Sequence, residues 1–403
     1  MGNLGSRDNL PAILSTHTRA LRHLGKPSES TVHRSVSLIP PVTTAPDTML
    51  NVCLIGAGGV GTIAAHVLEK SQRCRVTAVL RSNYAVVKEQ GFDIDSVDHG
   101  EVRGWKPHRI IPSLSDATTE PDQPYDFIVI TTKAIPELTA SLIPDLKRLI
   151  TPRKTSLVLI QNGLDIEKPL ASAFPETPVL SGLSMIGVRT TSPRTLLHED
   201  PDQLRIGPYW HHFDGPGPTP LPRQTQLDAA LLFVEVYNAG LSHAKTTRKS
   251  GAECVLADDI IAARWRKLLW NGSFNTLCTL LRMSVGELLS SPTGRKTLLE
   301  PAMREIAAVA TAAGYGDAVS EDVVQLMLHD TPETSPFRPS MLVDLEKGRP
   351  LELDVILGAP LAVAREKGVS TPVLSQVYEL LKVVQWHLTT TAANAKANAK
   401  ANA

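Results

Sequence analysis

The glycine-rich turn near residue 56 constrains the fold of this chain most. The segment "NVCLIGAGGVGTIAAHVLEK" passes from an apolar run through G-x-G-x-x-G, at Gly56, Gly58 and Gly61, into a helical pattern. In a strand–turn–helix unit the glycines allow a tight turn, close approach of a diphosphate and close packing of helix on strand. The helix N-terminus then offers free N–H groups to phosphates. We therefore predict a dinucleotide site, with a merely tight turn as the alternative. The predicted cofactor contacts here are Gly56, Ala57, Gly58, Gly59, Val60 and Gly61.

The rest of the first half continues the same alternation of strands and helices. Apolar runs of strand length are "LNVCLIG", "CRVTAVL", "YDFIVITT" and "TSLVLIQ", and further strands are expected in "TPVLSGLSMIGVRT" and "QLRIGP". Such alternation is typical of βαβ units around a largely parallel sheet. The Pro- and Gly-rich residues 207–226 predict a surface loop. We expect an α/β domain of the Rossmann type over residues 49–250.

After residue 250 the pattern changes to long helices. The predicted helices are 258–281, 295–314, 319–329, 335–346, 351–368 and 372–388. They predict an all-helical domain over residues 251–390. The segment 391–403 is a low-complexity tail, expected to be disordered or a frayed helix.

Residues 1–48 are rich in Ser, Thr, Pro and Arg and predict a disordered extension. Arginines among hydroxyl residues give this extension a weak likeness to a mitochondrial transit peptide. "MGNLGS" also matches the N-myristoylation pattern. Both remain alternatives to plain disorder.

Charge and cysteine content exclude several classes of function. The 41 basic residues balance 41 acidic ones, which argues against nucleic acid or an anionic membrane surface as partner. The four cysteines lack metal-ligand spacing, so we predict no metal site and no disulfide framework. A reducing compartment follows, the cytoplasm first and the mitochondrion as alternative. No apolar run reaches about 18 residues, so no membrane span is predicted.

Polar residues follow three of the predicted strands. "VTAVLRSN" ends in Arg81 and lacks the acidic residue that usually holds the ribose of NAD. An arginine there suits a 2′-phosphate and favours NADPH, although a surface arginine is the alternative. Lys133 and Asn162 follow two further strands. Because ligands bind at the carboxyl ends of parallel strands, both are predicted to contact the cofactor.

A helix in the second half carries a polar stripe. In "RWRKLLWNGSFNTL", Lys267, Asn271 and Asn275 are spaced four apart and share one face, while most other positions are apolar. Hydride transfer to a carbonyl leaves an alkoxide that needs a proton. A lysine in a partly desolvated site can supply it, because burial lowers its pKa. We predict that Lys267 donates this proton and that the two amides bind a polar substrate; a surface lysine is the alternative.

These segments together resemble the ketopantoate reductase (2-dehydropantoate 2-reductase) family over residues 50–388. The carrying segments are "LIGAGGVG", "ITTKA", "LIQNG", "RWRKLLWNGSFNTL", "VGELL", "PSMLVDLEKGRPLELDVILGAPLAVAREKGV" and "TPVLSQVYELL". The resemblance implies a C-terminal domain of the 6-phosphogluconate dehydrogenase C-terminal type. It also implies NADPH-dependent reduction of a 2-keto acid, ketopantoate, to (R)-pantoate in pantothenate biosynthesis, and it leaves a homodimer open.

The resemblance assigns residues as well. It implies that Lys267 is the proton donor, that Asn271 and Asn275 contact the substrate, that Ser340 binds the substrate carboxylate end, and that Glu352 lies by the nicotinamide ribose. Two alternatives remain: Ser340 as a helix cap, and Glu352 in a solvated turn.

Two positions depart from the family pattern. Family members usually have asparagine where this chain has Phe337, and often have another where it has Val285. Both changes are to apolar residues at positions expected on the substrate side. Two alternatives follow: a paralogous reductase of a bulkier 2-keto acid or other carbonyl compound, and a catalytically inactive dinucleotide-binding regulator.

Overall fold

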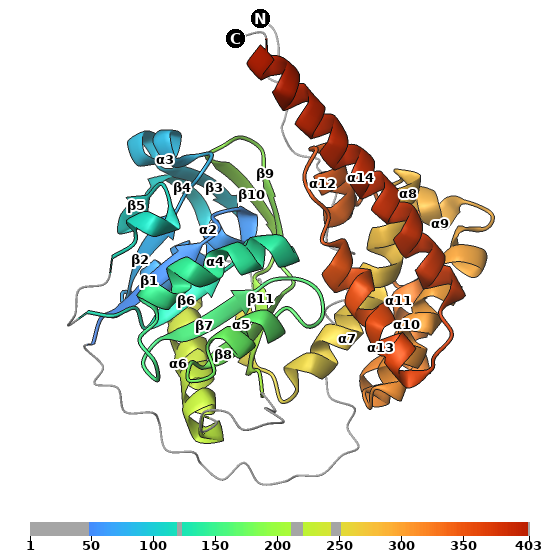
Figure 1. Ribbon diagram of the computed structural model, residues 1–403, viewed down its shortest axis with the longest axis horizontal. Coiled ribbons are helices and arrows are strands. Elements are labelled where there is room, and N and C mark those ends of the chain that lie inside the picture. Colours follow the sequence, from blue (N-terminus) through green and yellow to red (C-terminus); the bar gives the residue numbers. More distant parts are fainter. Residues whose placement is uncertain (1–47, 119–122, 211–220, 243–250, 402–403) are drawn as a thin grey trace, which may run out of the picture.

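The computed structural model describes residues 48–118, 123–210, 221–242 and 251–401. An α/β domain and a helical domain lie side by side, and helix α7 (Ile260–Trp270) lies between them (Figure 1). The predicted fold class is thereby confirmed. The predicted extension, with both targeting patterns, lies outside the described residues except for Thr48.

An eight-stranded sheet forms the centre of the α/β domain. Its strands run in the order β12-β11-β8-β7-β6-β1-β2-β5, and all neighbours pair in parallel except β8 and β11. Their bounds are β1 Leu50–Ile55, β2 Cys74–Val79, β5 Arg109–Ile111, β6 Phe127–Ile130, β7 Ser156–Ile160, β8 Val179–Ser184, β11 Gln203–Pro208 and β12 Glu253–Leu256. The central strands are buried on both faces, which explains why they are continuous apolar runs. Strand β12 lies in the range predicted for the helical domain but pairs with β11 in this sheet.

Helices cover both faces of this sheet. One face packs against α2 (Gly59–Lys70) and α6 (Arg223–Ser242), and the other against α4 (Pro136–Leu149) and α5 (Lys168–Ala173). Helix α3 (Tyr84–Gln90) follows β2. The sequence prediction missed α6, which begins inside the predicted loop 207–226.

A second, four-stranded sheet was not foreseen. It has the order β4-β3-β10-β9, with bounds β3 Phe92–Ser96, β4 Gly100–Trp105, β9 Gly187–Thr190 and β10 Thr195–Asp200. The stretch read as one strand region after residue 177 therefore divides into β8 and β9, which belong to different sheets. Strand β9 reaches the start of α2, where Val188 packs beside Gly59.

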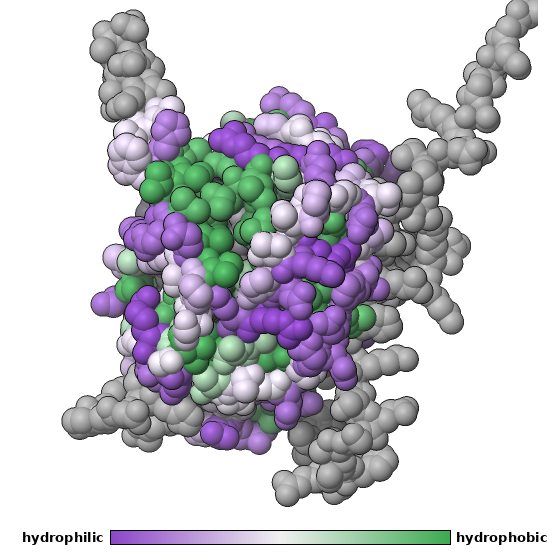
Figure 2. All heavy atoms as spheres, turned by 90° about the vertical axis from the view of Figure 1, so that its right-hand side faces the viewer, coloured by the Kyte–Doolittle hydropathy of each residue, from purple (hydrophilic) through white to green (hydrophobic). Residues whose placement is uncertain are grey.

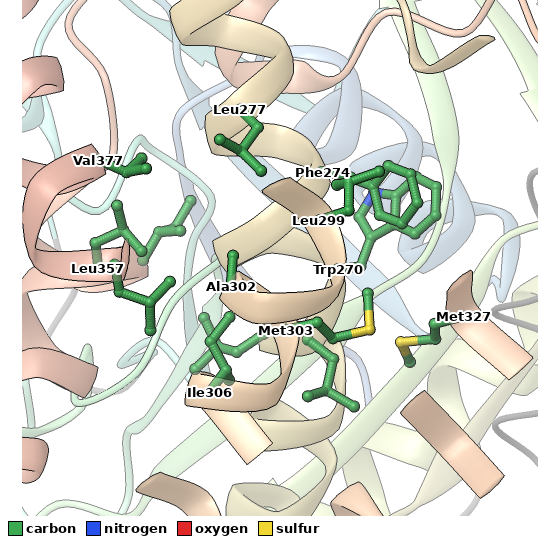
Figure 3. Close-up of a cluster of buried hydrophobic side chains, with 14 of the residues drawn as sticks. Trp270, Phe274, Leu277, Leu299, Ala302, Met303, Ile306, Met327, Leu357 and Val377 are labelled. Carbon is green, nitrogen blue, oxygen red and sulfur yellow. The ribbon is translucent and has the colours of Figure 1, made fainter. Parts of the chain in front are cut away.

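The helical domain has its own apolar core. After α7 it contains α8 Thr276–Leu281, α9 Val285–Ser290, α10 Glu300–Ala312, α11 Glu321–His329, α12 Ser340–Glu346, α13 Ala359–Lys367 and α14 Pro372–Ala401. Figure 3 shows Trp270 stacked on Phe274, with Leu299, Met303 and Ile306 below and beside them. The ring centroids of Trp270 and Phe274 are 4.1 Å apart. This packing uses the apolar face of the helix whose other face carries the polar stripe.

Three of the predicted long helices contain π-helical segments, at Asn271–Asn275, Gly294–Leu299 and Asp354–Gly358. The last two precede Pro301 and Pro360, near the starts of α10 and α13. A proline has no N–H and crowds the carbonyl four residues earlier, so the preceding turn widens. The first segment is followed by Thr276 and Thr279 of α8, whose hydroxyl groups donate back to the carbonyls of Gly272 and Asn275 within it, at 2.7 and 2.6 Å. Such bonds often bend helices.

Other helix ends differ from the prediction. Helix α12 begins at Ser340 instead of residue 335, because Pro339 is extended at the N-cap. Helix α9 was missed, and α14 continues to Ala401 through most of the predicted tail. Within the described residues, no helix is long and apolar enough to cross a membrane.

Candidate active site

The glycine-rich turn lies at the carboxyl end of β1, with the geometry that its sequence predicts. Gly56 has φ +102°, and a Cβ there would lie 2.8 Å from the backbone nitrogen of Thr132. A Cβ on Gly61 would collide with the Gly56 carbonyl, whereas one on Gly58 would meet nothing within 4 Å. Gly58 is thus the glycine next to open space, at the N-terminus of α2. A diphosphate could approach the backbone there.

The three predicted strand-end residues occupy two different places. Arg81 follows β2 and is exposed. Lys133 follows β6 and Asn162 follows β7, two neighbouring strands, and both side chains reach residues of the helical domain. Arg81 is therefore exposed after β2, whereas the other two residues lie at the domain junction.

Lys267 is partly buried at this junction. Its ammonium donates to Asn162 Oδ1 at 3.0 Å and to the carbonyl oxygen of Ser184, at the end of β8, at 2.5 Å. Helix α7 begins at an N-cap, Asp259, whose carboxylate accepts from two backbone N–H groups. Because its side chain is partly buried and hydrogen-bonded, Lys267 does not fit the alternative interpretation of a surface lysine.

Glu352 connects the two domains. It is 5% exposed, which excludes the solvated turn. Its carboxylate accepts from the backbone N–H of Ala134 at 3.0 Å, from Asn162 Nδ2 at 3.2 Å and from Lys133 Nζ at 3.4 Å. Lys133 also pairs with Asp344 of α12 at 2.5 Å. A continuous polar chain thus runs from Asp344 to Lys267.

The two lysines of this chain have different pKa shifts. Burial lowers the pKa of Lys267 to about 8, with the nearby Arg264 charge acting in the same direction and Glu352 opposing it. Burial also lowers the pKa of Lys133, but the Glu352 and Asp344 carboxylates outweigh it and raise the value above its usual range. A lysine with a lowered pKa can exchange its proton near neutral pH, whereas one with a raised pKa stays charged. Lys267 is the group suited to proton transfer.

The remaining residues that the sequence predicts to bind substrate follow Lys267 along the chain. Asn275 is buried; its Nδ2 donates to Ser340 Oγ at 3.4 Å, and its Oδ1 accepts from the backbone N–H of Met341 at 2.9 Å. Ser340 is the first residue of α12 and is exposed, and the N-cap is Pro339. The alternative interpretation of Ser340 as a helix cap is therefore wrong. Asn271, 7% exposed, begins the π-helical segment between Lys267 and Asn275.

The two departures from the family pattern lie close together but differ in burial. The backbone N–H of Val285 donates to the carbonyl of Phe337 at 2.9 Å. Val285 is fully buried in the helical core, whereas Phe337 is partly exposed. Only Phe337 can therefore present apolar surface to a ligand. The predicted substrate-side position of Val285 is not what the structure shows.

Sequence reasoning missed two sets of residues around the site. Asp344 lies four residues after Ser340 on α12, a spacing that could have revealed it. Arg264 and Glu167 form an ion pair at 2.9 Å whose side chains are both fully buried. No local pattern links these residues, since they come from different domains.

The fold and the site together define a class. A glycine-rich turn open at a helix N-terminus, facing a helical domain that supplies a partly buried lysine, is the construction of a two-domain, dinucleotide-dependent oxidoreductase.

Comparison with known proteins gives the family. The family model "Ketopantoate reductase PanE/ApbA" matches residues 52–210, and "Ketopantoate reductase PanE/ApbA C terminal" matches residues 259–385. The chain therefore belongs to the ketopantoate reductase family, a family of NADP-dependent oxidoreductases.

Its relatives include proteins of known and unknown activity. An uncharacterized protein of Saccharomyces cerevisiae is 35% identical, over 84% of this chain and 94% of that protein. The 2-dehydropantoate 2-reductase of a Nostoc species is 28% identical, over 82% and 93%. The crystal structure of 2-dehydropantoate 2-reductase from Methylococcus capsulatus is 31% identical, with a TM-score of 0.67 over 84% of this chain and 98% of that one.

More distant structures share the fold. A D-mandelate dehydrogenase with NADH and anilino(oxo)acetate is 22% identical, with a TM-score of 0.67 over 84% of this chain and all of that one. A dimeric ketopantoate reductase from Staphylococcus aureus is also 22% identical, with a TM-score of 0.61 over the same shares.

Proposed function

We propose that this protein reduces ketopantoate to (R)-pantoate with NADPH, and that Lys267 donates the proton. The observation that carries the proposal is the position of Lys267, partly buried at the domain junction with a pKa lowered to about 8. Family membership supports the reaction class, and the relatives named 2-dehydropantoate 2-reductase support the substrate.

The predicted cofactor residues fit a dinucleotide. The open space at Gly58 and the N-terminus of α2 suit the diphosphate, and exposed Arg81 suits a 2′-phosphate. Glu352, with Lys133 and Asn162, would hold the nicotinamide ribose. A bound nicotinamide would supply a hydride to the carbonyl carbon of the substrate.

The hydrogen bonds of Lys267 explain how it would act. An ammonium has three donors, and two are taken by Asn162 Oδ1 and the Ser184 carbonyl. The third is left for the substrate oxygen that gains negative charge. Donation of the proton would leave a neutral amine between two acceptors. Because the pKa of Lys267 is near 8, the ammonium can lose this proton near neutral pH.

The substrate would lie along the same helix. We propose that Asn271 and Asn275 hydrogen-bond its hydroxyl groups and that Ser340 binds its carboxylate end. The Asn275–Ser340 contact supports this arrangement, since it joins α12 to the π-helical segment that follows Lys267.

A second candidate is a paralogous reductase that acts on a bulkier 2-keto acid or other carbonyl compound. Phe337 favours it, because this partly exposed ring lies three residues before Ser340, where the family pattern has an amide. A panel of 2-keto acids with graded side chains, each assayed by NADPH absorbance, separates the two. Preference for ketopantoate by orders of magnitude rejects the paralogue.

The test of the main proposal is turnover by the purified full chain. We expect NADPH oxidation with ketopantoate and a loss of roughly 10²–10⁴-fold in Lys267→Ala, the usual contribution of a general acid. Lys296→Ala, a change of an exposed lysine in the same domain, is the control and should keep full activity. Tight NADPH binding without turnover of any carbonyl would support the inactive regulator instead.

We also propose a homodimer that covers an apolar surface of the helical domain. Leu380, Val383 and Trp386 are 43%, 62% and 64% exposed on α14, which packs on α8, and Leu281 and Met283 are exposed at the end of α8. Figure 2 shows that apolar side chains gather on this side of the molecule. We call the exposed residues Leu380, Val383 and Trp386 the exposed stripe on α14. The S. aureus relative is a dimer, and we infer that a second copy of this chain covers this stripe.

A further inference from the structure

Arg264 lies one helical turn before Lys267 and makes all its side-chain hydrogen bonds to the α/β domain. Its Nε donates to Ser181 Oγ at 2.8 Å and lies 2.9 Å from Glu167 Oε1. Its Nη1 donates to the carbonyls of Gln161 and Gly163, both at 2.9 Å, and its Nη2 donates to the carbonyl of Gly182 at 3.1 Å. Every nitrogen of the guanidinium is thus engaged.

These partners surround the two acceptors of Lys267. Gln161 and Gly163 flank Asn162, so the Nη1 atom of Arg264 holds the backbone on both sides of the amide that accepts from Lys267. Ser181 and Gly182 belong to β8, whose last residue provides the second acceptor. The guanidinium therefore fixes both segments against the helix that carries the lysine.

The ion pair is an unusual way to hold two domains together. Arg264 and Glu167 are fully buried, and Ser181 Oγ also donates to Glu167 at 2.5 Å. Apolar residues of similar volume often stabilise a fold as well as a buried ion pair does. The fork geometry of the guanidinium, which binds five acceptors at once, gives something that apolar packing cannot: a fixed register between α7 and the ends of β7 and β8.

The same charge acts on Lys267 electrostatically. The charged groups that face Lys267 are Arg264 on its own helix and Glu352 from the segment before α13. Arg264 lowers the pKa of Lys267, after burial, and Glu352 raises it. Removal of the guanidinium should therefore raise this pKa.

We propose that Arg264 is a positioning residue for Lys267, which sets the two hydrogen-bond acceptors of its ammonium and places a second positive charge one turn away. The proposal rests on the proposed role of Lys267 as proton donor. If it is right, the pair Arg264–Glu167 affects the rate of the reaction as well as the contact between the domains.

Three variants of the full chain test this assignment. Arg264→Met combined with Glu167→Leu removes both buried charges, Arg264→Lys keeps the charge but loses the fork, and Arg266→Met removes a neighbouring guanidinium as control. Two quantities are measured: kcat with NADPH and ketopantoate, and the pKa of Lys267 from ¹³C NMR of labelled lysines. The Lys267 resonance is identified by its absence in Lys267→Ala.

We expect the double variant to lose roughly 10–10²-fold in kcat, as expected for a misplaced catalytic group, and to show a higher pKa at Lys267. Arg264→Lys should lower kcat but keep the pKa of Lys267 near that of wild type. If the double variant does not fold, Arg264→Lys replaces it as the test, and a wild-type kcat in this variant overturns the proposal. Arg266→Met should change neither quantity.

A folded double variant with wild-type kcat overturns the proposal. A folded double variant with a lower kcat but an unchanged Lys267 titration does so too, because the role of the pair is then only structural. If the wild type turns over no carbonyl, the proposed function fails, but the NMR titration still decides whether Arg264 sets the state of Lys267.

Discussion

At the scale of single residues, the site separates two lysines that the sequence could only place near one another. Lys133 is held between Asp344 and Glu352, at 2.5 and 3.4 Å. Among the described residues, the hydrogen-bond acceptors of Lys267 are both neutral: Asn162 Oδ1 and the carbonyl of Ser184. A cation between two carboxylates keeps its proton, whereas a partly desolvated one with neutral acceptors gives it up more easily.

Arg81 allows a prediction about cofactor choice. Because it is exposed after β2 and no acidic residue stands in its place, Arg81→Ala should weaken NADPH binding by roughly tenfold and change NADH binding little. Dissociation constants for both nucleotides, measured by titration, check this. Arg75→Ala, a change of an exposed arginine within β2, is the control. Equal losses for both nucleotides would remove Arg81 as a reader of the 2′-phosphate.

Strand ends and a helical stripe allowed the sequence to place several candidate site residues, whose roles stay predictions. Lys133 and Asn162 were expected at the carboxyl edge of the sheet, and the structure brings both to Glu352. Arg264 and Glu167 could not be predicted, because the two residues meet only when the domains pack together. Val285 was misplaced because a sequence pattern does not tell a core position from a ligand-facing one.

At the scale of secondary structure, helical periodicity predicted most helices of the helical domain, although not α9, and it did not predict their internal geometry. The π-helical segments keep an apolar face, so the pattern looks continuous over 258–281 and 351–368. The second sheet was missed for a different reason: strands β3, β4 and β9 are partly exposed, and their sequences lack long apolar runs.

The second sheet also brings together a histidine cluster. The His66 ring lies 5.1 Å from the His99 ring and 4.9 Å from the Trp105 ring, and the His198 ring lies 6.2 Å from that of His99. Burial, followed by nearby positive charges that include Lys70, lowers the pKa of His66 to about 4 and that of His99 to about 3. The sequence did not predict this cluster, because its histidines lie far apart along the chain.

These shifts predict how stability depends on pH. Both histidines have lower pKa values folded than unfolded, so the unfolded state binds protons first and stability falls as pH drops from about 6.5 towards about 4. Asp202 opposes this: burial raises its pKa to about 7, so the folded state keeps a proton that the unfolded state loses above its ordinary pKa. His66 and His99 each contribute a loss of about 1.4 kcal/mol per pH unit in that window.

Substitution of one histidine should reduce the loss of stability in acid. The free energy of unfolding, measured by urea titration at about pH 7 and about pH 5, should fall less with acid in His66→Phe than in wild type. His329→Phe, on the exposed face of α11, is the control. An equal acid loss in His66→Phe and wild type would contradict the assignment.

At the scale of the whole molecule, the two domains are joined through few but buried polar contacts. Glu352 and Arg264 each bridge from one domain to the other, and Lys347 Nζ donates to the Thr190 carbonyl of β9 at 3.5 Å. The predicted two-domain order is confirmed, but its exact bounds stay a prediction.

The exposed stripe on α14 gives a prediction about assembly. If a second copy covers it, light scattering should give the mass of a dimer for wild type, and Val383→Glu with Trp386→Glu should give a monomer, because two buried charges would stay unpaired. Lys382→Glu with Glu379→Lys, at exposed positions of the same helix, is the control and should remain dimeric. A wild-type monomer at high concentration would reject the homodimer.

The pH dependence of kcat/KM for reduction of ketopantoate by NADPH tests the central claim most directly. Because Lys267 must be protonated to donate and its pKa is lowered to about 8, activity should be full below this pH and fall as pH rises through it. Residual activity of Lys267→Ala should lack this limb. A Lys267→Ala variant with wild-type turnover and the same descending limb would contradict the account.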